Sequence, residues 1–347
     1  MKNSNTGRAA ILTLILVILF VSGWEYYVRH KGMGISYDDD ENLWSDKRAM
    51  IYEPKEKATV LIGSSRNKYD IDIPTWKALT GDHPIQLAMV GTSPLPILND
   101  LAKDEKFNGK LIIDVTELLF FSTSLQRTAG PNTNINYFKK RTPAQRFSFA
   151  VDHFLESSFI FLDKDNLSLN AMLDKVPLPS RKDVFSLPYP CPMEFDRVTF
   201  DRQNFMTPKF LTDTNLQNQV KGLWAFYRQI SKDLPLTDLQ IDSLITTVKN
   251  DVNKIKGRGG EVIFVRSPSS GPFLMGEKIG YPRQKYWDRL LELTGCQGIH
   301  FADYPAIDHF ECPEFSHLKR SDAVIYTTNL VNILQQKGWV FPLRSKI

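Results

Sequence analysis

The sequence predicts an α/β protein built on a parallel sheet of about five strands. Short apolar runs alternate with helical segments along most of the chain, which is the pattern of strand–helix–strand units joined by right-handed crossovers. Several of these runs, such as 110–115, are apolar at nearly every position, which is typical of a strand covered by helices on both faces. The predicted strands are 58–62, 84–90, 110–115, 261–265 and 298–302.

Local start and stop signals predict the helices between these strands. Asp72 followed by Pro74 is a typical helix start, and Gly81 is a typical stop. The glycine-rich run 257–260 ends a helix that is predicted from its apolar periodicity. The predicted helices lie at about 41–52, 73–80, 96–106, 236–255, 286–291 and 321–336.

The N-terminus predicts export and a membrane anchor. Lys2 and Arg8 precede an apolar stretch at 9–23, and the aromatic residues Trp24, Tyr26 and Tyr27 follow it. Positive residues before the apolar stretch predict a cytoplasmic N-terminus, and interfacial aromatic residues extend a short span. We therefore predict a single-pass cell-membrane protein with its remaining chain in the periplasm, a cleaved signal peptide being the alternative.

The rest of the chain divides into four predicted parts. After the anchor at 1–31, residues 32–56 are polar and read as a linker, in which the acidic run 38–41 is expected to be solvated. The α/β domain comprises 57–120 and 236–347. Between its halves, 121–235 is rich in aromatic residues and proline, with helical patches near 143–161 and 215–232. A structureless connection of this length is improbable, so we predict an inserted subdomain that serves as a lid.

Composition excludes several classes of protein. The 347 residues are 42% hydrophobic and 24% charged, which is typical of an ordinary globular protein, and the net charge of +4 is too small and dispersed for a nucleic-acid-binding protein. Cys191, Cys296 and Cys312 fit no metal-ligand spacing, so no metal and no cofactor is predicted. Outside the cytoplasm Cys296 and Cys312 could form a disulfide; three buried free thiols are the alternative.

Two segments far apart in the sequence carry candidate catalytic residues. The strand at 58–62 leads Ser65 into a tight turn, and about 250 residues later Glu314 and His317 lie three positions apart. A serine nucleophile needs a base to remove its proton, and the base needs a carboxylate to fix its tautomer. We predict Ser65 as the nucleophile, His317 as the base and Glu314 as the orienting acid. A turn-capping serine and a loop histidine bonded to backbone are the alternatives.

These segments resemble two sequence blocks of the SGNH/GDSL hydrolases. The Gly-Ser-Ser run that ends at Ser65 matches the family's Gly-Asp-Ser, and the Glu-x-x-His-Leu run from Glu314 to Leu318 matches its Asp-x-x-His block. Glutamate in place of aspartate adds one methylene of reach. The resemblance covers roughly 58–120 and 236–335, and it implies a flavodoxin-like three-layer α/β/α sandwich.

The family's two other blocks are matched less well. Its oxyanion glycine corresponds to Gly91 in Val-Gly-Thr-Ser, and its Gly-x-Asn-Asp block is missing. Thr116, in Asp-Val-Thr-Glu, takes the position of the missing asparagine. The resemblance thus implies that the N–H groups of Ser65 and Gly91, together with Thr116, hold the oxyanion.

The expected site lies at the carboxyl ends of the strands, where working groups collect in parallel sheets. Ser65, Gly91, Thr116 and Arg266 each follow the end of a predicted strand. We predict that Arg66 and Arg266 bind an anionic or acyl-bearing substrate; structural salt bridges are the alternative.

The predicted function is an exported serine esterase or O-acyltransferase. Its anchor and Gly-Ser-Ser-Arg turn resemble the membrane-anchored SGNH-like proteins of alginate O-acetylation and teichoic acid D-alanylation. That resemblance implies an O-acylated, above all acetylated, polysaccharide of the cell envelope as substrate, or an acyl donor, and a membrane-bound O-acyltransferase as partner. Water as acceptor gives hydrolysis, and a sugar hydroxyl gives transfer. The alternative is a catalytically degenerate SGNH-like module that binds glycan or serves as a scaffold.

Overall fold

The computed structural model describes residues 3–54, 57–174, 176, 190–230 and 235–342. The chain divides into two compact units, each of which is described separately below. One comprises Met1–Asp38 and Pro143–Val184, and the other comprises Asp39–Thr142 and Phe185–Ile347. The 121–235 segment, predicted from sequence as one insertion, is therefore shared between them.

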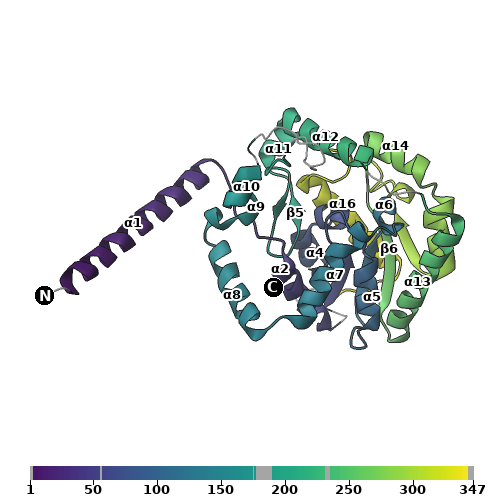
Figure 1. The fold of residues 1–347 in the computed structure, drawn as a ribbon. Helices are drawn as coiled ribbons and strands as arrows, with labels where there is room; N and C mark the ends of the chain where they lie inside the picture. The colour runs from purple at the N-terminus through teal and green to yellow at the C-terminus, as the bar shows by residue number, and fades with distance from the viewer. Residues whose placement is uncertain (1–2, 55–56, 175, 177–189, 231–234, 343–347) are drawn as a thin grey trace. The chain divides into compact units, whose positions relative to one another are not determined.

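The larger unit contains a five-stranded parallel sheet, as the sequence predicts (Figure 1). The strand order is β2-β1-β3-β6-β7, and every pair is parallel. The second and last strands end earlier than predicted, because the chain leaves regular pairing after Gln86 and enters a 3₁₀ turn at Phe301. The strands are β1 (Ala58–Ile62), β2 (His83–Gln86), β3 (Lys110–Asp114), β6 (Glu261–Arg266) and β7 (Gln297–His300).

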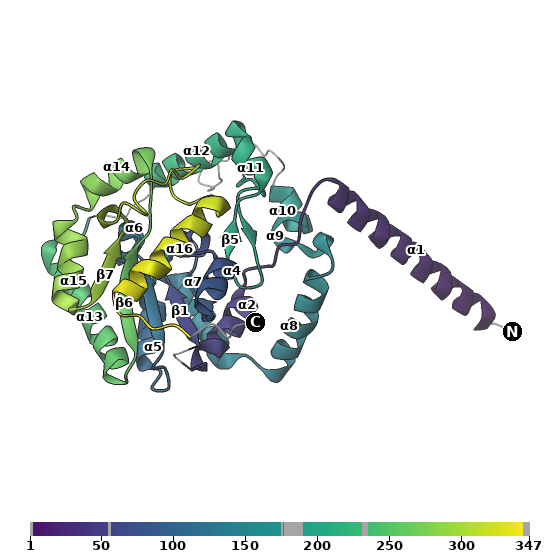
Figure 2. The same ribbon diagram turned by 180° about the vertical axis from the view of Figure 1, so that it is seen from behind.

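Both faces of this sheet are buried under helices. Successive side chains of a strand point to opposite faces, so Val60 and Ile62 enter one hydrophobic cluster and Leu61 enters the other. The first cluster includes residues of α5 (Leu95–Lys103) and α13 (Asp238–Gly257), and the second includes residues of α4 (Ile73–Thr80) and α16 (Arg320–Gln336). Figures 1 and 2 show these helix pairs on opposite sides of the sheet.

The capping signals in the sequence act as predicted. The Asp72 side chain accepts a hydrogen bond from Thr75 N–H at the start of α4, and Gly81 ends that helix with φ +66°. The start of α13 shows a further cap that was not predicted, a reciprocal capping box between Thr237 and Gln240. The other helices of this unit are α2 (Glu41–Ala49), α3 (Ser65–Asp70), α6 (Glu117–Phe120), α7 (Leu125–Lys140), α11 (Pro208–Thr212), α12 (Thr214–Ile230), α14 (Gly271–Gly280) and α15 (Arg289–Thr294).

Shorter elements complete the larger unit. A two-stranded antiparallel ribbon pairs β4 (Arg197–Val198) with β5 (Asn204–Phe205). The 3₁₀ turns η1 (Met50–Tyr52) and η4 (Phe301–Asp303) follow α2 and β7, and the π-helical segment η3 (Gln284–Asp288) precedes α15.

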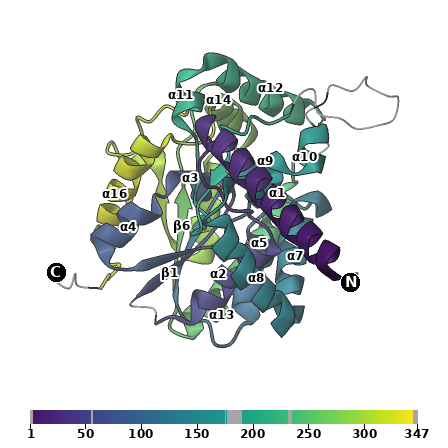
Figure 3. The same ribbon diagram turned by 90° about the vertical axis from the view of Figure 1, so that its left-hand side faces the viewer.

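The smaller unit contains the N-terminal apolar helix α1 (Asn3–His30), shown in Figure 3. Its segment from residue 5 to 30 is long and apolar enough to cross a membrane, and none of its most apolar window is buried. The unit also contains α8 (Pro143–Glu156), η2 (Ile160–Leu162), α9 (Lys164–Leu167) and α10 (Leu169–Asp174). Near its C-terminal end, α1 is bonded to η2, since the Glu25 carboxylate accepts from Ile160 and Phe161 N–H.

The acidic run at 38–41 is structural, contrary to the expectation that it is solvated. Asp38 accepts a hydrogen bond from Lys164 N–H within the smaller unit. In the larger unit, Asp39 is ion-paired with the buried side chains of Lys68 and Arg202, and Asp40 caps α2. The pairing with two cations holds the pKa of Asp39 at about 2, although burial alone would raise it.

The three cysteines are free thiols, as in the second alternative, but only two of them are buried as that alternative expects. Cys296 and Cys312 are buried and unpaired with each other, and Cys191 is exposed.

Candidate active site

The candidate nucleophile lies at the junction of β1 and α3. Gly63 follows the strand, and there is no room for a side chain at this position, because a Cβ atom would lie 2.6 Å from Cβ of Asp114. Ser64 is the N-cap residue of α3, and Ser65 is the first residue of the helix. A glycine is therefore required for the chain to turn so closely against the end of β3.

The two adjacent serines have different environments. Ser64 is buried, and its hydroxyl lies 2.7 Å from the hydroxyl of Thr116. The Ser65 side chain is only partly buried, and its hydroxyl faces a histidine. Of the two, Ser65 is the one whose hydroxyl lies beside a base, and its role as nucleophile stays a prediction.

The structure brings the three predicted catalytic residues together. His317 Nε2 lies 2.8 Å from Ser65 Oγ, and His317 Nδ1 lies 3.0 Å from Glu314 Oε1. In the tautomer that satisfies both contacts, Nδ1–H donates to Glu314 and Nε2 accepts the serine proton. These three residues form a continuous chain of hydrogen bonds from a hydroxyl to a buried carboxylate, with the geometry of a Ser–His–acid triad.

Glu314 is fully buried and held by several N–H donors. Its Oε1 accepts from the backbone N–H of Ser316 and of His317, as well as from the imidazole. Its Oε2 accepts from the indole N–H of Trp224 at 2.5 Å. Burial raises the pKa of Glu314, but His317 and these donors outweigh that effect, so its pKa lies below the usual value. The carboxylate is thus kept ionised beside the imidazole.

The loop that carries the acid and the base contains a strained residue. Phe315, between Glu314 and His317, has φ +79°, a left-handed conformation that is rare for a bulky side chain. The Phe315 ring occupies the space beside Gly271, where a Cβ atom would lie 2.8 Å from the ring. The Phe315 carbonyl accepts from Ser270 N–H. This turn folds the glutamate side chain back onto the histidine three residues later.

The imidazole is surrounded by aromatic residues that were not predicted from the sequence. The centroid of the Tyr69 ring lies 4.5 Å from that of the His317 ring. The centroids of the Phe195 and Trp224 rings lie 5.8 and 6.2 Å from it. Phe195 and Trp224 belong to the 121–235 segment, which the sequence predicts only as an aromatic-rich insertion. Trp224 lies in the aromatic run Trp224–Tyr227, and nothing in that run indicates that its N–H group reaches Glu314.

We predict that Trp224→Phe destabilises the protein. The ring is retained but the N–H donor is lost, so Glu314 Oε2 becomes a buried acceptor without this partner. Loss of a hydrogen bond to a charged group typically lowers the free energy of unfolding by about 1.5–3 kcal/mol. Urea denaturation at pH 7 measures this change. Tyr227→Phe, three residues further along α12, is the matched control and is expected to change stability by much less.

The predicted oxyanion donors lie near the serine, but they are not equivalent. Backbone pairing continues past β2, where Met89 N–H donates to the Gly63 carbonyl, so the loop that leads to Gly91 runs beside the serine turn. Gly91 has φ +67° and its N–H donates to no acceptor among the described residues. Thr116, in contrast, donates its single hydroxyl proton to Asp114. The Thr116 hydroxyl can donate to an oxyanion only if its proton turns away from Asp114.

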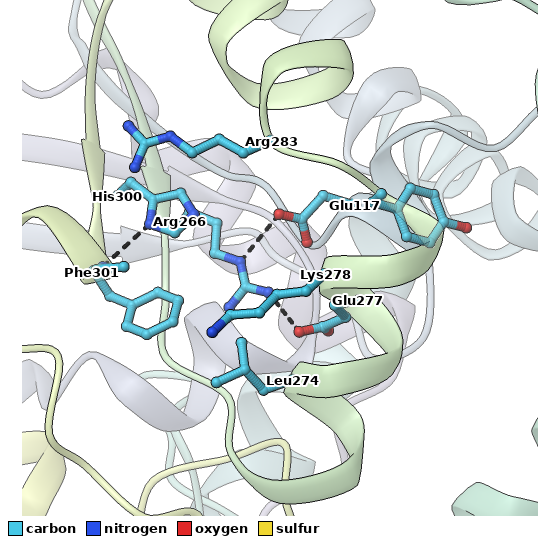
Figure 4. A pocket seen from close by; sticks show the side chains of 10 residues that line it. Glu117, Arg266, Leu274, Glu277, Lys278, Arg283, His300 and Phe301 are labelled. Carbon is cyan, nitrogen blue, oxygen red and sulfur yellow. Dashed lines mark hydrogen bonds and ion pairs between the residues drawn. The ribbon is translucent and has the colours of Figure 1, made fainter.

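The two arginines predicted to bind substrate are buried and ion-paired. Arg66 and Arg266 are 1% and 2% exposed, and both pair with Glu277 of α14. Arg266 also pairs with Glu117. A pocket at the ends of β6 and β7 is lined by Arg266, Glu117 and Glu277, with His300 and Arg283 at its rim (Figure 4). Structural ion pairs, the alternative given by the sequence, therefore occupy both guanidinium groups.

We predict that Glu277→Gln strongly destabilises the protein. The free energy of unfolding of the variant should also depend less on pH in the acid range. Burial raises the pKa of Glu277, but Arg66 and Arg266 hold it at about 2. A carboxylate whose pKa is lowered in the folded state stabilises the fold above its unfolded pKa, and this contribution is lost as pH falls toward 2. Removing the shared partner of two buried guanidinium groups costs about 3–5 kcal/mol at pH 7.

Urea denaturation at pH 7 and at pH 3 tests this prediction. The difference between wild type and Glu277→Gln should be large at pH 7 and smaller at pH 3. Glu292→Gln, at an exposed position of α15, is the control. An equal loss of stability for both variants would contradict the role given to the ion pairs.

The chain was compared with known protein families and with curated proteins. No family model matches it, and no curated protein matches its sequence. The chemistry of the site therefore rests on its own geometry: an accessible hydroxyl, a base within hydrogen-bond reach and a buried carboxylate. This constellation fits nucleophilic catalysis at a carbonyl carbon.

Proposed function

We propose that this protein is a membrane-anchored serine esterase or O-acyltransferase of the SGNH type. The observation that carries the proposal is the continuous contact from Ser65 Oγ through His317 to Glu314, at 2.8 and 3.0 Å. These are the distances that proton transfer between a nucleophile and a base requires. The parallel sheet is loosely consistent with the proposed flavodoxin-like sandwich of that family.

The proposed reaction proceeds through an acyl-enzyme. His317 Nε2 takes the Ser65 proton as Ser65 Oγ attacks the ester carbonyl. The bond to the leaving alcohol then breaks, and the alcohol takes the proton from His317. In the second half, His317 removes a proton from water or a sugar hydroxyl, which attacks the acyl carbon, and Ser65 recovers its proton as it leaves. Glu314 holds the Nδ1–H tautomer and stabilises the imidazolium in both halves.

The proposed oxyanion donors are the N–H groups of Ser65 and Gly91. Ser65 is the first residue of α3, and the N–H groups of a first helical turn have no intrahelical partner. Removal of one such donor typically costs about 100- to 1000-fold in rate. The absence of the asparagine block therefore favours a slow reaction with water, and an acceptor that completes the site would favour transfer.

The proposed substrate is an O-acylated, above all acetylated, glycan of the cell envelope. Support comes from the spanning-length helix α1 and from the aromatic rings of Phe195 and Trp224 beside the imidazole, since aromatic rings are common sugar contacts. With the N-terminus in the cytoplasm, the catalytic unit would be periplasmic. A membrane-bound O-acyltransferase that supplies the acyl group is the proposed partner.

One observation favours a second candidate, a degenerate module that binds glycan without reacting. The family's asparagine donor is missing, and the hydroxyl proton of Thr116 is directed to Asp114. A site with a triad but a weak oxyanion hole could bind an acylated sugar and leave it intact.

Hydrolysis of p-nitrophenyl acetate by the purified full-length protein distinguishes the two candidates. The esterase or transferase predicts slow release of p-nitrophenol that is lost in His317→Ala. It also predicts that an acceptor oligosaccharide lowers the yield of free acetate and becomes acetylated. Glycan binding without hydrolysis, unchanged by His317→Ala, would instead establish the binding module.

A further inference from the structure

We propose that helix α8 lies in the polar–apolar interface of a lipid bilayer, with an aromatic stripe immersed at the acyl-chain boundary. The inference rests on the membrane anchoring that is part of the proposed function, and it assigns a second lipid contact in addition to α1. All of the contacts that support it lie within the smaller unit.

The stripe consists of Phe147, Val151 and Phe154. These residues are spaced by four and three positions, which places them in one row along the helix. Their side chains are 73%, 43% and 69% exposed, and α8 has no buried residue. Two phenylalanines that are largely exposed in one row are unusual on a surface that faces only water.

The opposite side of α8 is occupied by the protein itself. The ring of His153 stacks on Phe149 and also contacts the ring of Tyr37, which precedes the acidic run in the chain. The side of α8 that carries Phe149 and His153 therefore packs within the smaller unit, and the stripe at 147, 151 and 154 is the face left uncovered.

The contacts of α1 place this stripe close to the level of the membrane surface. Glu25 and Arg29 lie among the residues that would form the interfacial end of the span, next to Trp24 and Tyr27. Glu25 accepts from the N–H groups that begin η2, and Arg29 donates to the Ser158 carbonyl. Ile160 lies six positions after Phe154, which is at most about 20 Å of extended chain. The stripe is thus tethered near the interfacial end of α1.

Charge and a second apolar patch favour lipid over a protein partner. Arg146, an exposed basic residue, lies in the first turn of α8. A short helix with an aromatic face and a basic residue at one end is suited to the interface of an anionic bilayer. In the same unit, α10 exposes Leu169, Met172 and Leu173. Two uncovered apolar faces beside one spanning helix are expected where the unit meets a bilayer.

Spin labels on the full-length protein in liposomes of phosphatidylethanolamine and phosphatidylglycerol test the proposal. Single cysteines replace Phe147, Val151 or Phe154 in a Cys191→Ser background, which removes the exposed native thiol. Ser148→Cys and Asp152→Cys, both exposed on the polar side of α8, are the matched controls. Ile15→Cys reports on α1 itself. Collisions with oxygen, which concentrates in lipid, are compared with collisions with a water-soluble nickel chelate.

The expected result is a ratio of oxygen to nickel collisions that is several-fold higher at the three stripe positions than at positions 148 and 152. A high ratio at Ile15 with a low ratio along the stripe would overturn the inference and leave the anchor intact. A low ratio at Ile15 would contradict the anchoring itself, and the inference with it. Stripe labels that are shielded from both reagents, or that show dipolar broadening between copies, would show a protein–protein contact and also overturn the inference.

Discussion

Ser65→Ala is expected to abolish covalent labelling by a fluorophosphonate and to reduce ester hydrolysis by about 10⁶-fold, as in serine hydrolases that lose their nucleophile. The variant removes the one hydroxyl that lies 2.8 Å from His317 Nε2. Because the Ser65 side chain is partly exposed, and no backbone group of the described residues bonds to its hydroxyl, the fold should be retained. Mass spectrometry of the labelled protein should place the adduct on the peptide that contains Ser65.

Ser64→Ala is the matched control for this prediction. It makes the same chemical change one residue earlier, where the hydroxyl is buried against Thr116. It should lower stability slightly and leave labelling in place. Labelling that survives in Ser65→Ala and disappears in Ser64→Ala would move the nucleophile to the neighbouring serine and contradict the triad described here.

Glu314→Gln is expected to lower the rate of ester hydrolysis by about 10⁴-fold while preserving binding of an unreactive ester analogue. The glutamine amide is similar in shape but neutral. It carries two N–H donors at a position where backbone N–H groups, the imidazole and Trp224 all direct protons toward the carboxylate. The imidazolium formed during the reaction then has no counter-charge. Steady-state kinetics should show the loss in kcat and little change in KM.

Glu311→Gln provides the control, since this glutamate lies in the same loop but is exposed. Near-normal activity in Glu311→Gln together with the loss in Glu314→Gln would assign the effect to the carboxylate behind the histidine. An active Glu314→Gln variant would indicate that another acid orients the base. In that case Asp308, which lies beside His309 on the surface, is the next residue to test.

The strands and capped helices of the larger unit could be predicted because their signals are local. Apolar runs predict β1 and β3, while Asp72 and Gly81 predict helix ends that depend on neighbouring atoms alone. The helix α3 was not predicted, because its sequence from Ser65 to Asp70 is polar and nearly every residue is buried by long-range ion pairs and hydrogen bonds. Burial of Lys68 against Asp39 and of Arg66 against Glu277 depends on residues far away in the sequence.

The same distinction holds for the site. Ser65, Glu314 and His317 could be proposed because each triad role needs a particular side-chain chemistry in a short motif. Trp224 and Phe195 lie in a segment with weak periodicity, and their contacts with Glu314 and His317 follow only from tertiary folding. For Arg266, the position at a strand end was correct, but the sequence could not show that Glu277 pairs with both Arg266 and Arg66.

The packing of Phe315 against Gly271 has a consequence for how this protein can diverge. Position 271 has φ +52° and no free volume, because the ring of residue 315 fills it. A larger side chain at position 271 therefore requires a smaller one at position 315. The left-handed backbone at both positions favours replacement by residues such as asparagine or glycine. Among related chains, these two positions should covary as a pair, and the double replacement Gly271→Asn with Phe315→Gly should be less harmful than the sum of its single changes.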